Sequence, residues 1–286
     1  MAFLPFAVSG VGLGGIYALC GVGIVILYRA SGTLNLALGA VGAVSAYITW
    51  TALQVGLPAP ASWICGIAVA TLLSLGYGVF VSPRLSHREP GVRSIATLGL
   101  ALGILGAIAL VWGVGIPRRL ILPTDGSYLS IFGTRLNYTR VAALAVAAVG
   151  VVGTNLLLWR TRIGLAMRAL ASDRNISSLV GVRIARVDAV AWTLSGIFAG
   201  VAGIFLADIV RLEAGYLMAM VIPAIAAATI GGFRSLPLAF VGGLIAGLCE
   251  ATLTAVPLIG DYRSAAPYVL ALAAIALTSR TASTQE

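Results

Sequence analysis

Long apolar runs without a charged residue divide this chain into segments. No charge lies between Arg29 and Arg84, and further uncharged runs cover 94–117, 141–159, 189–207, 214–233 and 264–279. A helix needs about 20 residues to cross a bilayer. The pattern predicts an all-α, polytopic membrane protein of about eight to nine transmembrane segments in one domain, 1–286. The nine apolar segments are 6–28, 34–53, 61–81, 94–114, 139–159, 187–207, 218–230, 237–256 and 267–278.

The seventh segment, 218–230, is shorter than a full crossing. Pro223 interrupts it and Gly231-Gly232 ends it, which predicts a tilted, broken or re-entrant helix. Irregular backbone at membrane depth is tolerated only where protein or a water-filled cavity covers it. We therefore expect this segment to lie inside the bundle.

Composition agrees with a membrane protein. The chain is 60% hydrophobic and 9% charged, whereas soluble domains carry about 25% charged residues. All 18 basic residues are Arg, and the formal net charge is +9. Basic loops of this kind hold cytoplasmic positions next to anionic lipid. Nucleic-acid binding is not expected, because no basic patch is interleaved with aromatic residues.

Several chemistries are excluded or disfavoured by residue type. Without Lys there is no Lys-containing phosphate loop, pyridoxal Schiff base or Ser-Lys dyad, so any ATP must be bound by another chain. Cys20, Cys65 and Cys249 lie in apolar segments without zinc or redox spacing. His87 is the single His and makes no metal site alone. We expect no catalytic residues, no metal and no cofactor of the chain's own.

The distribution of Arg predicts the orientation. With nine crossings, 12 Arg lie in the loops of one side and six in the loops of the other. The excess marks the first side as cytoplasmic. The N-terminus is then outside, the C-terminus inside, the loop 115–138 extracytoplasmic and the loop 160–186 cytoplasmic. Within 115–138, Asp125-Gly126 before the alternating run 127–132 predicts a small β-hairpin.

The loop 160–186 predicts two short amphipathic helices. Ile163, Met167 and Leu170 follow the spacing i, i+4, i+7 and form one apolar face, with Arg162 and Arg168 off that face. Ser172 or Asp173 is placed to cap a second helix, and Gly181 to end it. Two interpretations stay open: helices that lie on lipid, or a platform that couples the chain to a cytoplasmic partner. The apolar face either seats in a groove of that partner or packs on the bundle.

Four motifs in order resemble the permeases of bacterial ABC transporters for branched-chain amino acids, in particular the smaller of two paired permease subunits. The similarity as a whole runs from about Gly12 to Glu250. The motifs are Gly32-Thr33-Leu34-Asn35-Leu36-Ala37-Leu38-Gly39-Ala40; Arg162-x-Gly164-x-x-x-Arg168-Ala169 with Ala171-x-Asp173 and Gly181-Val182; Ser195-Gly196-x-x-Ala199-Gly200-x-Ala202-Gly203; and Gly231-Gly232-Phe233-x-Ser235-Leu236-Pro237 with Gly242-Gly243.

The resemblance implies a multi-pass permease of the bacterial cytoplasmic membrane. It implies a second permease subunit, homologous or identical, two cytoplasmic ATP-binding subunits and an extracytoplasmic solute-binding protein. The family often has a His and an acid after the Asn-x-Ala element, where this chain has Leu38 and Ala40. This departure leaves the solute open.

Polar residues inside apolar segments are the candidates for the solute pathway. Asn35 lies at a break flanked by Gly32 and Gly39, where unwound backbone offers hydrogen-bonding groups to a solute; the alternative is an Asn that caps a helix. Thr97 and Glu250 are the other candidates. The expected residues of ATPase coupling are Arg162, Ile163, Gly164, Met167, Arg168, Ala169, Leu170, Asp173 and Gly181.

Two other function classes compete with the permease. A secondary transporter or channel for a small solute usually has more embedded acids or His for ion coupling, and Glu250 is nearly alone here. A membrane enzyme needs a nucleophile–base or metal constellation that the chain does not readily supply. A permease subunit without enzymatic activity is therefore the preferred hypothesis.

Overall fold

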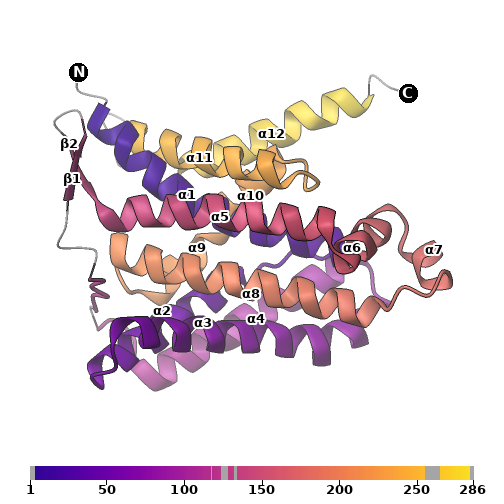
Figure 1. Ribbon diagram of the computed structural model, residues 1–286, viewed down its shortest axis with the longest axis horizontal. Helices are drawn as coiled ribbons and strands as arrows, with labels where there is room; N and C mark the ends of the chain where they lie inside the picture. Colours follow the sequence, from indigo (N-terminus) through magenta and orange to yellow (C-terminus); the bar gives the residue numbers. More distant parts are fainter. Residues whose placement is uncertain (1–3, 117, 124–127, 132–133, 255–264, 284–286) are drawn as a thin grey trace.

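The computed structural model describes residues 4–116, 118–123, 128–131, 134–254 and 265–283. Its helices run back and forth along the longest axis of the molecule (Figure 1). The helical membrane fold predicted from the sequence is confirmed. The helices are α1 (Leu4–Ser31), α2 (Leu38–Gln54), α3 (Ala59–Gly76), α4 (Pro90–Trp112), α5 (Tyr138–Arg160), α6 (Arg162–Ser172), α7 (Arg174–Leu179), α8 (Ile184–Ile209), α9 (Ala214–Ala219), α10 (Val221–Ile230), α11 (Leu236–Leu253) and α12 (Ala266–Ser283).

Within the described chain, six helices are long and apolar enough to cross a membrane. They are α1, α3 with its extension to Leu85, α4, α5, α8 and α11. The extension consists of a π-helical turn, Tyr77–Val81, and a 3-10 turn, Ser82–Leu85. Three further apolar segments are shorter: α2 with 17 residues, the pair α9 and α10, and α12. Together these segments correspond to the nine predicted apolar segments.

α1 is the central helix of the bundle. In its most apolar stretch 89% of the residues are buried, and it packs on α5, α8, α10 and α11. Its crossing with α11 is lined by glycine on both sides. A Cβ atom at Gly247 would overlap the backbone of Gly14, and one at Gly243 would overlap that of Ala18. Small residues spaced by four, such as Gly243 and Gly247, let membrane helices approach at backbone distance.

α8 is the second buried helix and packs on α1, α2 and α3. A Cβ atom at Gly203 would overlap the backbone of Gly42 in α2, and one at Gly196 would press on the side chain of Ser74 in α3. The motif 195–203, which carried part of the family resemblance, therefore marks a helix crossing. Because α1 and α8 occupy the interior, the outer helices α3, α4 and α5 leave most residues of their apolar stretches without full burial inside this chain.

The seventh apolar segment is broken, as predicted. α9 ends at Ala219, and α10 begins at Val221. The predicted position of the break was wrong, because Pro223 lies in the first turn of α10 instead of interrupting the segment. Proline is tolerated there, since the first N–H groups of a helix have no partner within it. Gly231-Gly232 ends α10, with Gly232 at φ +57°.

A small antiparallel hairpin precedes α5. Strands β1 (Tyr128–Ile131) and β2 (Thr134–Asn137) pair in the register Ile131↔Thr134 to Tyr128↔Asn137. The hairpin prediction is confirmed, with 128–131 as its first strand. Asp125-Gly126, which carried the prediction, falls outside the described residues.

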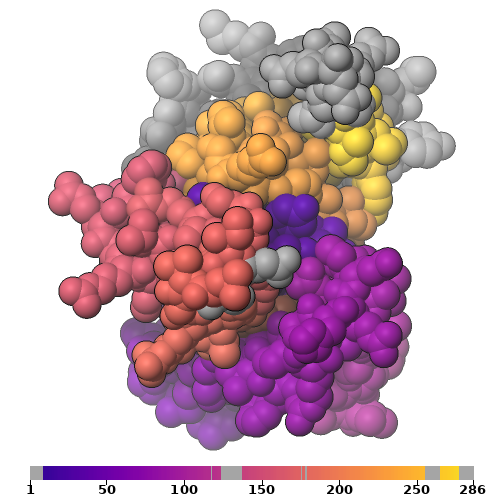
Figure 2. Space-filling view, turned by 90° about the vertical axis from the view of Figure 1, so that its right-hand side faces the viewer, coloured from indigo at the N-terminus to yellow at the C-terminus, as the bar shows by residue number. Residues whose placement is uncertain are grey.

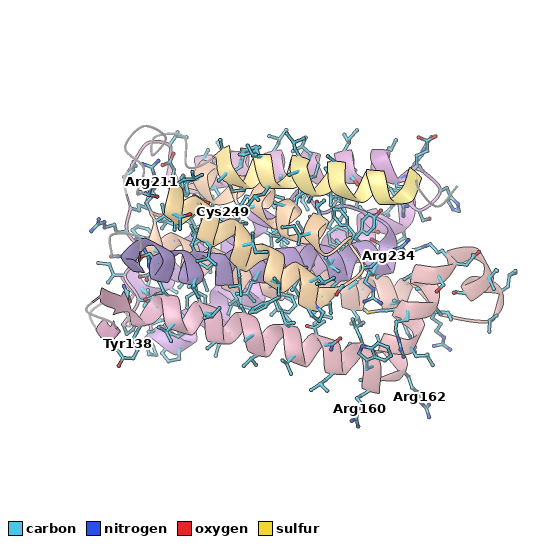
Figure 3. All side chains as sticks on the ribbon, turned by 90° about the horizontal axis from the view of Figure 1, so that it is seen from above. Tyr138, Arg160, Arg162, Arg211, Arg234 and Cys249 are labelled. Carbon is cyan, nitrogen blue, oxygen red and sulfur yellow. The ribbon has the colours of Figure 1, made fainter. Side chains whose placement is uncertain are left out.

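The bundle has two ends of different character, here called the hairpin end and the α6–α7 end. Tyr138 and Arg211 lie at the hairpin end, and Arg160, Arg162 and Arg234 lie at the α6–α7 end (Figure 3). The loops that hold most of the Arg residues thus share one end, as the alternation of nine segments requires. That the α6–α7 end is cytoplasmic remains a prediction.

Candidate functional site

The connection between α1 and α2 runs as irregular chain inside the bundle. Gly32 has φ +67°, a left-handed conformation that glycine adopts without strain. The Leu34 N–H donates to Ser94 Oγ at 3.0 Å and the Leu36 N–H to Thr97 Oγ1 at 2.9 Å. Buried backbone groups need such partners, and α4 supplies both. The predicted break is confirmed. Thr97 is fully buried and accepts a hydrogen bond from the irregular backbone at this break.

Asn35 holds the start of α2. Its Oδ1 accepts from the Ala37 N–H at 3.1 Å, and its Nδ2 donates to Ser195 Oγ at 3.3 Å. These contacts form a turn before α2, whose N-cap is Ala37 without a side-chain cap hydrogen bond, so the alternative role of Asn35 as the helix cap is wrong. Gly39 packs so closely that a Cβ atom would overlap the Met218 carbonyl of α9. A role of these residues beside a solute pathway remains a prediction.

Glu250 is the buried acid of α11 at the hairpin end. Its carboxylate accepts a hydrogen bond of 2.7 Å from the Tyr17 hydroxyl of α1. It borders a cavity of about 350 Å³. The cavity is lined by Ser9, Leu13, Arg140, Ile209, Val210, Tyr216, Glu250, Ala251 and Thr254.

Arg140 supplies the positive charge of this cavity. It lies in the first turn of α5 and donates from Nη1 to the Ser9 carbonyl at 3.0 Å. Its side-chain stem crosses α1 at Gly12, where a Cβ atom would overlap it. One carboxylate, one guanidinium and aliphatic walls therefore border the same space. This combination suits a small zwitterion with an aliphatic body.

Glu250 and Tyr216 also line a second cavity of about 80 Å³. Tyr17, Met220 and Pro223 belong to its wall, so the break between α9 and α10 lies next to Glu250. Asn35 and Thr97 line neither of these two cavities. Of the five predicted pathway residues, Glu250 is the one that borders them.

The loop 160–186 forms the two predicted helices, α6 and α7. Thr161 caps α6 by accepting from the Gly164 N–H at 3.1 Å. Asp173 caps α7, since its Oδ1 accepts from the Ile176 N–H at 2.9 Å. Gly181, at φ +89°, follows the end of α7. The capping roles predicted for Asp173 and Gly181 are confirmed.

The apolar face of α6 packs on the bundle. Of the two alternatives for this face, a groove of a partner or the bundle itself, the structure shows the second. Met167 is 2% exposed and Leu170 is 5% exposed. Gly164 contacts Leu157 and Leu158 so closely that a Cβ atom there would overlap the backbone of α5. In this structure these three residues are therefore unavailable to a partner, contrary to the coupling contact expected of them. Ile163 at the edge of the face is 44% exposed.

Besides Ile163, the described part of α6, α7 and the turn after them exposes four large apolar side chains that sequence reasoning missed. They are Leu165, Ile176, Leu179 and Val180. The helical spacing identifies an apolar face but does not say that the bundle covers it. Arg162 is exposed, Ala169 is half-buried, and the Arg168 guanidinium lies 4.4 Å from the centre of the Trp159 ring.

An ion pair anchors α7 to the bundle and was also missed. Arg174 Nη2 lies 2.6 Å from Asp188 Oδ2 of α8, and Arg174 Nη1 donates to the Ala30 carbonyl at 2.7 Å. Arg93 of α4 donates to the Ser31 carbonyl at 2.7 Å. Asp188, an acid at the start of an apolar segment, was the available sequence signal.

Comparison with known proteins gives a consistent result. Residues 6–276 match the family model described as branched-chain amino acid transport system / permease component. LivH of Salmonella typhimurium, a permease protein of a high-affinity branched-chain amino acid transport system, is 27% identical and the alignment covers 94% of this chain and 91% of LivH. BraD of Pseudomonas aeruginosa, a permease protein of such a system, is 26% identical over 87% of this chain and 85% of BraD.

A solved structure shares the fold. PsaBC from Streptococcus pneumoniae in complex with Fab matches with a TM-score of 0.50 at 13% identity, covering 93% of this chain and 89% of that one. At this level of identity the match concerns the arrangement of helices alone.

Proposed function

Because this chain belongs to the family of permease components of branched-chain amino acid transport systems, we propose that it is the transmembrane subunit of an ABC importer for branched-chain amino acids or a related small polar solute. It is a multi-pass protein of the cytoplasmic membrane. The match to the family over residues 6–276 carries this proposal. Relatives that align over most of their length, LivH and BraD, support it.

The cavity beside Glu250 supports the solute class. A zwitterionic amino acid would place its ammonium group toward Glu250 and its carboxylate toward Arg140, with its aliphatic side chain against Leu13 and Ile209. Charged groups at membrane depth are costly, so a pair of opposite charges around one cavity favours a ligand with two charges. The cavity lies at the hairpin end, the predicted extracytoplasmic side, where an importer accepts its solute.

Energy would come from partner chains. The chain itself has no expected nucleotide site or cofactor, so ATP would be bound by cytoplasmic ATP-binding subunits. The projecting α6–α7 pair (Figure 1), with Leu165 and Leu179 exposed, offers the contact surface. A solute-binding protein at the hairpin end and a second permease subunit, homologous or identical, complete the proposed assembly.

Transport in proteoliposomes tests the proposal. The chain is reconstituted with its ATP-binding subunits, permease partner and solute-binding protein, and uptake of radiolabelled leucine is followed. Uptake is expected only with ATP at the ATPase side. Glu250→Gln and Arg140→Gln should each raise the half-saturating leucine concentration by about tenfold or more, equivalent to about 1.4 kcal/mol.

The matched control is Arg119→Gln, which removes one positive charge from the hairpin end outside the 350 Å³ cavity. It should leave uptake unchanged. Uptake that proceeds without ATP or ATPase would overturn the importer and favour a secondary transporter or channel. ATP-dependent uptake of another solute class would overturn the amino-acid assignment alone.

A further inference from the structure

A basic cavity lies at the α6–α7 end, remote from Glu250. Its volume is about 840 Å³, and five Arg residues from different elements line it. No Asp or Glu is among its described lining residues. Figure 2 looks onto this end, where the indigo end of α1 lies between salmon α6–α7, purple helices and orange α10–α11. The five are Arg29 of α1, Arg93 of α4, Arg168 of α6, Arg174 of α7 and Arg234 before α11.

The positive charge of this cavity exceeds the negative charge around it. Arg174 pairs with Asp188 at 2.6 Å. Arg93 donates to the neutral Ser31 carbonyl, and Arg168 stacks on Trp159. The carboxyl end of α1 contributes roughly half a negative charge. Five guanidinium groups therefore face one carboxylate and a helix end.

Two buried donors in this cluster are unsatisfied. The Nε atoms of Arg93 and Arg168 are buried and have no hydrogen-bond partner among the described residues. A buried N–H without an acceptor is unfavourable and rare in folded proteins. Because both atoms are shielded from solvent, a ligand in the cavity does not reach them directly; they add to the desolvation cost of two guanidinium groups, which an anion in the cavity would offset through its charge.

The chemistry of the wall suits phosphate. Guanidinium groups present forked N–H donors that match phosphate oxygens, and the volume lies in the range of small-ligand sites. Tyr28 and Phe233 also line the cavity, and their ring centres are 4.8 Å apart. Basic pockets between membrane helices on the cytoplasmic side are typical sites for anionic lipid headgroups. A carboxylate would occupy fewer of these donors than a phosphate.

We propose that this cavity binds a phosphate-bearing anion that joins the ends of α1, α4 and α6 to the turn before α11. The phosphate belongs either to a soluble cytoplasmic compound or to an anionic phospholipid headgroup. In both cases the anion would stabilise α6 and α7, the helices proposed to meet the ATPase. The proposal does not depend on which solute the protein transports, and its test requires no transport.

Thermal unfolding of the full-length chain in nanodiscs tests it. In phosphatidylcholine nanodiscs, inorganic phosphate is titrated against chloride at equal ionic strength. In a second arm, part of the phosphatidylcholine is replaced with phosphatidylglycerol, and the buffer contains no inorganic phosphate. Saturating ligand should raise Tm by about 4 °C or more in at least one arm. Phosphate acting alone identifies a soluble ligand, and phosphatidylglycerol acting alone identifies a lipid.

Variants locate the effect. Arg234→Gln, an exposed position in the turn, and Arg29→Gln should each remove at least half of the rise, whereas Arg234→Lys should retain most of it. Arg211→Gln at the hairpin end, which loses the exposed pair with Glu213, is the matched control and should keep the full rise. If Arg29→Gln does not fold, Arg234→Gln and Arg234→Lys still decide the result.

Three results would overturn the proposal. Wild type could gain no stability from phosphate or phosphatidylglycerol beyond chloride. The gain could be equal in wild type and Arg234→Gln. The variants could keep the full rise in Tm from phosphate and phosphatidylglycerol but lose a rise that the added ATP-binding subunit produces. That result would assign the cavity to acidic residues of the ATP-binding subunit instead of a phosphate.

Discussion

The Tyr17 hydroxyl of α1 donates a 2.7 Å hydrogen bond to the Glu250 carboxylate of α11, 233 positions later in the chain. Both residues are buried. The contact is possible because Gly243 and Gly247 bring α11 to backbone distance from α1. An acid at membrane depth is costly unless it is hydrogen-bonded or faces a cavity, and Glu250 satisfies both conditions.

Replacing Tyr17 with Phe should weaken this site without changing its shape. The buried carboxylate loses one hydrogen bond, which costs about 1–3 kcal/mol of stability, and the half-saturating leucine concentration should rise several-fold. Thermal unfolding in detergent and proteoliposome uptake measure the two effects. Tyr138→Phe, at a half-exposed position, is the control. Equal stability of the two variants would show that the Tyr17 hydroxyl does not stabilise the Glu250 carboxylate.

The α1–α11 crossing predicts a strong effect at one glycine. Gly247→Ala places a Cβ atom against the backbone of Gly14, so the helices must separate, at a cost of about 1–3 kcal/mol. Gly103→Ala in α4 is the control, because no atom lies within 4 Å of the added Cβ there. Thermal unfolding of both purified variants checks this. A Gly247→Ala protein as stable as Gly103→Ala would contradict the close crossing.

The exposed side of α6 and α7 predicts a coupling phenotype without a folding phenotype. Leu165→Asp and Leu179→Asp change side chains that are 61% and 86% exposed, so Tm should change little. Affinity for the ATP-binding subunit should fall about tenfold or more, as for an apolar anchor at an interface. Co-purification and solute-stimulated ATP hydrolysis measure the loss. Normal stimulation in both variants would exclude this surface from coupling.

The buried side of α6 predicts the opposite combination. Gly164→Leu should displace α6 from α5, because the added side chain overlaps the backbone of Leu158. We expect loss of stimulated ATP hydrolysis together with a lower Tm. Unchanged stability with lost coupling would indicate that Gly164 contacts the partner directly.

The predicted orientation is tested by labelling single Cys residues. In a background with Cys20, Cys65 and Cys249 replaced, Ser172→Cys reports on the α6–α7 end and Glu213→Cys on the hairpin end; both positions are exposed. An impermeant maleimide added to intact cells should label Glu213→Cys only. Labelling of Ser172→Cys only would invert the orientation.

The sequence by itself determined the class of the protein and the positions of its segments. Apolar runs of about 20 residues have one stable solution in a bilayer, the helix, so composition alone predicts the bundle. The distribution of Arg placed the loops in two groups that do lie at opposite ends. Local signals were also sufficient for the break after Gly32, the cap at Asp173 and the stop at Gly231-Gly232, because each depends on a few neighbouring residues.

Only the tertiary structure decided which surface each polar or apolar residue meets. The spacing of Met167 and Leu170 predicted a helix face but not that α5 and α1 cover it, since spacing describes one helix and burial depends on its neighbours. Tyr17 and Glu250, and the Arg residues around the α6–α7 cavity, come from segments far apart in the sequence. Their meeting depends on how closely glycine lets the helices pack, and that packing is a property of the whole bundle.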